Sequence, residues 1–147
     1  MKRRIPKFAF VLLTSCSSLA FASCNKGPAA PTGETYKFYQ FIEGETVHNI
    51  GDEYYGITLS EDYIVVTLYN NGTVTEANQT SVGVNVWTET YTGTWTNEGI
   101  NYTLTLNSRD GETIETPVVE HWTLENDVFT EVETVGLVNW TYILHKA

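Results

Sequence analysis

Cysteine is scarce in this chain. Only two of the 147 residues are cysteines, Cys16 and Cys24, and none follows Cys24. The rest of the chain therefore has no thiol for a disulfide or for a thiolate-bound metal site. A domain without these crosslinks must bury enough apolar surface to fold by itself.

Basic residues are also scarce after the first residues. All 18 acidic residues lie after Cys24, against four basic ones, so residues 24–147 carry a formal net charge of −14. The four basic residues are Lys26, Lys37, Arg109 and Lys146. Because so acidic a surface repels anions, we predict no binding to nucleic acids, and any attachment to a membrane would need acyl chains.

The sequence motifs of catalysis are missing. The chain has no G-x-S-x-G elbow and no phosphate-binding loop, and no cysteine lies beyond residue 24. Serine occurs only three times after residue 33, at Ser60, Ser81 and Ser108. We therefore predict that the protein is not an enzyme and that it requires no cofactor.

Histidines and carboxylates show no spacing typical of a site. His48, His121 and His145 have no partner at H-x-H or H-x-x-x-H spacing, so we predict no metal site. Carboxylates lie close together at several points, but in so acidic a chain this indicates little about acid–base chemistry. We interpret Glu131 and Glu133, which share one face of a strand, as part of a solvated side.

One apolar stretch near the start is typical of an export signal. Basic residues precede an apolar segment at about residues 8–21, which is interrupted and shorter than the ~20 apolar residues of a membrane-spanning helix. This layout is that of a secretory signal peptide. We therefore expect residues 1–23 to be removed on export.

The end of this segment resembles the lipobox of bacterial lipoproteins. "FASC" places Ala22 and Ser23 before Cys24, although the family prefers leucine where this chain has Phe21. "LTSC", ending at Cys16, fits the tetrapeptide better but leaves a short apolar stretch, so we favour Cys24. The resemblance implies that the Cys24 thiol is lipidated and that acyl chains anchor the protein to a membrane of the bacterial envelope, on its periplasmic or cell-surface side.

The remaining chain divides into a tether and one domain. Residues 24–33 are rich in proline and glycine and lack periodicity, which predicts a flexible tether. Residues 34–147 show alternation of apolar and polar residues and are rich in Thr, Val, Tyr and Trp. Both features favour strands, and no helical stripe interrupts them.

Turn signals recur at short intervals along the domain. The clearest lies within residues 62–80, where Asn71-Gly72 predicts a tight hairpin. About eight or nine strands joined by such turns predict an all-β fold, an antiparallel up-and-down barrel with a β-sandwich as the alternative. Residues 42–56 are less regular, and we expect a loop or a short helical cap over one barrel end.

Three short motifs resemble a known group of domains. They are "NGT" at 71–73, "GTW" at 93–95 and "YTLTL" at 102–106. Their order is similar to that in the lipocalin-like (calycin-like) domains of bacterial lipoproteins. True lipocalins carry G-x-W on the first strand, whereas here it is mid-chain, so residues are not mapped one to one. The resemblance implies a small antiparallel barrel with an apolar interior.

Aromatic residues are the best candidates for a binding site. Trp87, Tyr91 and Trp95 fall four residues apart and so share one strand face. Facing inward, they would pack in the core or line a pocket; facing outward, they would form a platform for sugars or a partner. We predict a small apolar or amphipathic ligand in a barrel mouth lined by these three and Tyr102. The alternatives are a surface protein with a filled core that contacts glycan or another envelope protein, and a hydrolase using carboxylates.

Overall fold

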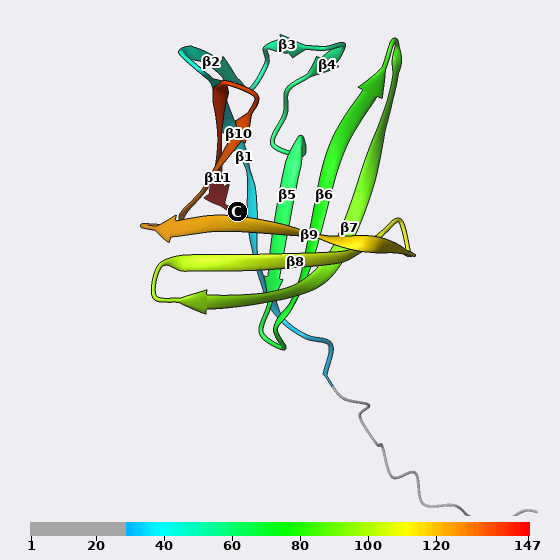
Figure 1. Ribbon diagram of the computed structural model, residues 1–147, viewed down its shortest axis with the longest axis vertical. Coiled ribbons are helices and arrows are strands. Elements are labelled where there is room, and N and C mark those ends of the chain that lie inside the picture. Colours follow the sequence, from blue (N-terminus) through cyan, green and yellow to red (C-terminus); the bar gives the residue numbers. More distant parts are fainter. Residues whose placement is uncertain (1–28) are drawn as a thin grey trace, which may run out of the picture.

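The computed structural model describes residues 29–147, which form eleven strands and no helix (Figure 1). The predictions for the signal peptide, Cys16 and Cys24 lie outside these residues. The long strands are β1 (Gly33–Glu43), β5 (Ile64–Tyr69), β6 (Thr73–Val82), β7 (Asn85–Glu98), β8 (Asn101–Arg109), β9 (Glu112–Glu125), β10 (Val128–Val135) and β11 (Val138–Lys146). The short strands are β2 (Thr46–Asn49), β3 (Glu53–Tyr54) and β4 (Ile57–Thr58).

The eight long strands close into an antiparallel barrel. From β5 to β11 each strand pairs with its neighbour in the chain, and β1 pairs with both β5 and β11. At the closure Phe38 lies opposite Leu144, and the Ala147 amide donates to the Thr35 carbonyl over 2.9 Å. This confirms the predicted all-β barrel rather than a sandwich, with β2 as one extra strand on β1.

The predicted turns form where the sequence supplies residues that tolerate a positive φ. Gly72 has a φ of 81° in the turn between β5 and β6, as the Asn-Gly signal predicts. Asn126 and Asp127, with φ of 51° and 63°, form the turn between β9 and β10. Both side chains are among the few that adopt this region readily.

β7 bends near Gly93, where its register against β8 shifts, and so pairs with both β6 and β8. Figure 1 shows β7 descending beside β6 and then turning to run beside β8. A Cβ atom at Gly93 would lie 1.9 Å from the Thr105 carbonyl oxygen, so only glycine allows the two backbones to approach this closely.

The segment between β1 and β5 covers one end of the barrel. It forms β2 and the small β3–β4 hairpin, so the alternative of a helical cap was wrong. Ile57 and Leu59 are buried, and the Tyr54 ring meets the Phe41 ring edge-on at 4.7 Å. Burying these apolar side chains holds the segment against the barrel.

Aromatic side chains fill the middle of the barrel. Phe129 is fully buried, and its ring centroid lies 4.7 Å from that of Trp122 and 4.9 Å from that of Tyr36. The remaining core residues come from alternate positions of the surrounding strands, as expected for a barrel interior. They include Phe38, Val66, Leu68, Val74, Leu104, Leu106 and Leu144.

Candidate ligand-binding site

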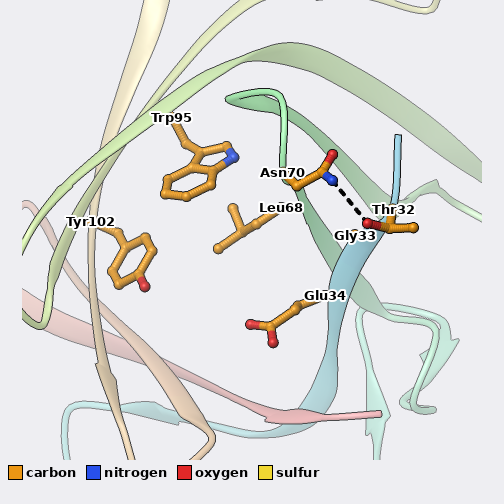
Figure 2. A pocket seen from close by; sticks show the side chains of 7 residues that line it. All are labelled: Thr32, Gly33, Glu34, Leu68, Asn70, Trp95 and Tyr102. Atoms are coloured by element: carbon orange, nitrogen blue, oxygen red, sulfur yellow. Dashed lines mark hydrogen bonds between the residues drawn. The ribbon is translucent and has the colours of Figure 1, made fainter. Parts of the chain in front are cut away.

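The barrel end at which β1 begins carries an open cleft. Its volume is about 350 Å³, within the usual range for small-molecule sites. Residues from three separate segments surround it: the start of β1, the end of β5, and the β7–β8 hairpin (Figure 2). The lining residues are Thr32, Gly33, Glu34, Leu68, Asn70, Trp95 and Tyr102.

Two stacked aromatic rings form one wall of this cleft. The centroids of Trp95 and Tyr102 lie 5.6 Å apart, with 29° between the ring planes. The Trp95 indole N–H donates to the Tyr69 carbonyl over 2.9 Å, which fixes the orientation of the ring. Leu68, only 5% exposed, lies between Trp95 and Glu34 in Figure 2. The two rings and Leu68 therefore present a preformed apolar surface to the cleft.

Polar groups lie on the opposite side of the cleft. Asn70 donates through Nδ2 to Thr32 Oγ1 over 3.0 Å. The Glu34 carboxylate accepts from Lys146 Nζ over 2.7 Å and from the Tyr36 hydroxyl over 3.2 Å. These bonds, that from Lys146 above all, lower the pKa of Glu34, so this carboxylate is charged and already paired. Apolar and polar groups thus face each other across the cleft, an arrangement that suits an amphipathic molecule.

The structure brings together two of the four residues predicted to bind a ligand. Trp95 and Tyr102 line the cleft. Trp87 and Tyr91 lie on the same face of β7 but beyond the Gly93 bend, toward the turn with β6. Tyr91 packs against the core, whereas Trp87 is 41% exposed, and the side chains of both donate to the Glu89 carboxylate.

Sequence reasoning missed the half of the cleft that comes from β1 and β5. Thr32 lies within the proline- and glycine-rich stretch of residues 24–33 and Glu34 directly follows it, and nothing in this local pattern indicates a site. Their place depends on β1 pairing with β5 and on Lys146 reaching Glu34 from β11. Only Asn70 carried a local signal, because it precedes the predicted Asn-Gly turn.

A second group of polar residues faces the barrel interior away from the cleft. Glu76 on β6 is only 4% exposed, and Glu120 on β9 and Glu131 on β10 are half-buried. The interpretation of Glu131 as solvated was wrong: it continues the inward face begun by Phe129, whereas Glu133 is exposed. We refer to Glu76, Glu120 and Glu131 as the carboxyl cluster.

Burial keeps protons on part of the carboxyl cluster. Desolvation raises the pKa of Glu131 to about 8, and the nearby Glu120 and Glu133 add to the shift. Desolvation also raises the pKa of Glu76 well above its ordinary value, with Glu120 as the next cause. Protonated Glu76 is able to donate to Glu120, which gives a partner to Glu76 Oε2, an atom that otherwise has none.

Among residues 29–147, two side-chain donors serve the cluster, and neither belongs to a lysine or an arginine. The Trp122 indole N–H donates to Glu120 Oε2 over 3.0 Å, and Asn78 Nδ2 donates to Glu76 Oε1 over 2.5 Å. The three lysines and arginines within residues 29–147 lie elsewhere. Lys37 contacts Asp62, Lys146 contacts Glu34, and Arg109 lies near Tyr91 and Glu89.

Within residues 29–147 no group of three or more His, Cys, Asp and Glu side chains is arranged to hold a metal ion. In the same range no helix has the length and apolar character to cross a membrane.

Comparison with protein-family models, with curated proteins and with solved structures found no match to this chain. The barrel is consistent with the lipocalin-like resemblance at the level of fold.

Proposed function

We propose that this protein is a binding protein rather than an enzyme, and that it holds one small amphipathic ligand in the cleft. The Trp95–Tyr102 wall over Leu68 supports this most strongly, because it offers a rigid apolar surface opposite polar groups. A cleft of about 350 Å³ suits a compact, planar or short-chain molecule.

The cleft is tested by titrating the protein with a short-chain fatty acid and with an aromatic dye. We expect saturable binding in calorimetry and a shift of the Trp95 indole resonance in NMR spectra. Thr32→Trp should block the cleft and weaken binding at least tenfold, because Thr32 is exposed on its rim. Trp87→Phe is the matched control on the same strand and should bind as the wild type does. Equal binding by the Thr32→Trp variant would refute the cleft as the site.

The export and anchoring of the protein are a separate part of the proposal. The signal-like start and the lipobox-like "FASC" support lipidation at Cys24 and a place in the bacterial envelope. Labelling cells with a fatty-acid analogue should modify the wild type and Cys16→Ser but not Cys24→Ser. Labelling lost instead with Cys16→Ser would assign the anchor to Cys16.

An interaction protein with a filled core is the second candidate. The aromatic packing around Phe129 and the exposed apolar tips of two hairpins favour it. Val84 between β6 and β7 and Leu137 between β10 and β11 are both almost completely exposed. Under this alternative, Val84→Ser with Leu137→Ser would abolish retention by envelope glycan or protein fractions, and the cleft would bind neither probe.

A further inference from the structure

The cleft presents one charged side chain to a ligand. Of the seven residues that line it, all within residues 29–147, only Glu34 carries a charge. Its carboxylate extends from β1 toward the side of the cleft that holds Tyr102 (Figure 2). A ligand whose apolar body lies against the Trp95 ring therefore brings its polar end close to this carboxylate, and the surroundings of Glu34 limit the chemistry of that end.

The Glu34 carboxylate has two partners and capacity for another. Its Oε1 atom accepts from Lys146 Nζ over 2.7 Å, and its Oε2 atom accepts from the Tyr36 hydroxyl over 3.2 Å. A carboxylate offers about four acceptor positions, so these two bonds leave room for a donor from a ligand. Such a bond is stronger than one between two neutral groups, because the acceptor is ionised.

An anionic end group does not suit this cleft. The hydrogen bond from Lys146 above all lowers the pKa of Glu34, so its carboxylate is charged. The Lys146 ammonium is engaged with Glu34 and also lies 3.8 Å from Asp127 Oδ1. A ligand carboxylate in the cleft would thus face a like charge, and the lining residues offer it no cation.

A cationic end group is disfavoured as well. Lys146 Nζ already occupies Glu34 Oε1, so an ammonium ion would share this carboxylate with a second positive charge. An ammonium ion also only donates, whereas the hydroxyls of Thr32 and Tyr102 and the amide of Asn70 both donate and accept. A neutral group that donates and accepts matches this set, and a hydroxyl is such a group.

We propose that the ligand of the cleft is a small alcohol, and that the Glu34–Lys146 pair sets the preference for its neutral hydroxyl end. The hydroxyl donates to the Glu34 carboxylate, and the apolar body lies against Trp95 and Leu68. This inference rests on the proposed function, because it names the class of ligand that the same cleft takes. A fatty acid of equal length binds through its chain, but more weakly, with its carboxylate in solvent at the open side.

Three probes with the same chain and different ends test this preference: 1-hexanol, hexanoate and hexylamine, titrated into the protein at pH 7. We expect each probe to shift the Trp95 indole resonance, and hexanol to bind about fivefold more tightly than either ion, the size of effect typical of exposed charges. Equal or tighter binding of hexanoate or hexylamine would overturn this inference and keep the cleft as the site. If no probe binds, the cleft itself fails, and this inference fails with it.

Substitutions in the ion pair should change the preference and leave the site able to bind. Glu34→Gln removes the carboxylate charge and should bring the affinity for hexanoate to within about twofold of that for hexanol. Lys146→Met leaves Glu34 charged without its ammonium partner and should raise the affinity for hexylamine above that for hexanol. Glu61→Gln is the matched control, because it removes a carboxylate from an exposed ion pair with Lys37, away from the cleft. A wild-type preference in both Glu34→Gln and Lys146→Met would show that this pair does not set it.

Discussion

The indole N–H of Trp122 donates to the carboxylate of Glu120 over 3.0 Å. The same indole ring lies flat against Phe129, with 13° between the ring planes. Trp122 therefore contacts both the apolar core and the carboxyl cluster. The middle of the barrel interior is apolar, and the part beside it that holds Glu76, Glu120 and Glu131 is polar.

Stability should fall as pH rises through neutrality. The pKa of Glu131 is about 8 in the folded protein against 4.5 for an ordinary glutamate, so the folded state holds the extra proton between these values. Stabilisation by this group is complete below about pH 4.5 and is lost as pH rises to about 8, at a cost on the order of a few kcal/mol. Thermal unfolding followed from pH 5 to pH 9 measures the effect.

Glutamine variants identify the groups behind this pH dependence. Glu131→Gln and Glu76→Gln should raise the melting temperature at pH 8 and flatten its pH profile, because neither amide ionises. Glu125→Gln, on an exposed carboxylate, should keep the wild-type slope. An unchanged slope in both inward variants would show that neither carboxyl holds a proton in the folded protein.

Gly93→Ala should be strongly destabilising. The added methyl would lie 1.9 Å from the Thr105 carbonyl oxygen, so either β7 or β8 must move. We expect a loss of about 3 kcal/mol or more in the free energy of unfolding by urea. Gly99→Asn is the control, since Gly99 has open space around it and a φ of 63° that asparagine tolerates. A wild-type urea midpoint for Gly93→Ala would mean that β7 does not approach β8 this closely at Gly93.

Phe129→Ala should remove the centre of the core. Its ring is fully buried against Trp122 and Tyr36, and such truncations typically cost about 3–5 kcal/mol. Val132→Ala, on the same strand but 60% exposed, should change the free energy of unfolding by less than about 0.5 kcal/mol. Similar losses for both variants would contradict the assignment of the inner and outer faces of β10.

Barrel closure should depend on packing rather than on the ion pair at its edge. Leu144 is fully buried opposite Phe38, so Leu144→Ala should cost about 2–5 kcal/mol. The contact between Lys146 and Glu34 is solvent-exposed, so Lys146→Met should leave the urea midpoint almost unchanged. A larger loss for Lys146→Met than for Leu144→Ala would reverse this ranking.

Local patterns predicted the fold well because they act over short distances. The Asn71-Gly72 turn and the inward alternation depend on neighbours in the chain, and both formed as expected. The bend at Gly93 was not predicted, because it arises from contact with Thr105 on another strand. It divides the predicted aromatic face of β7, so that Trp95 lines the cleft while Trp87 does not.

The polar interior was harder to predict. The β9–β10 hairpin places Glu120 near Glu131, but only closure of the barrel brings Glu76 on β6 to them. A signal was present in the spacing of Phe129 and Glu131, which places both on one face. This spacing was not enough to predict a buried Glu131, because the chain has 18 acidic residues and a carboxylate usually lies in solvent.

The most direct test of ligand binding uses the indole N–H resonances, which report separately on the two parts of the barrel. Titration with a short-chain fatty acid should shift the Trp95 resonance progressively until the site is saturated. The Trp122 resonance should not shift, because of these two residues only Trp95 lines the cleft. No shift of Trp95 at millimolar ligand, or equal shifts of both resonances, would contradict the account.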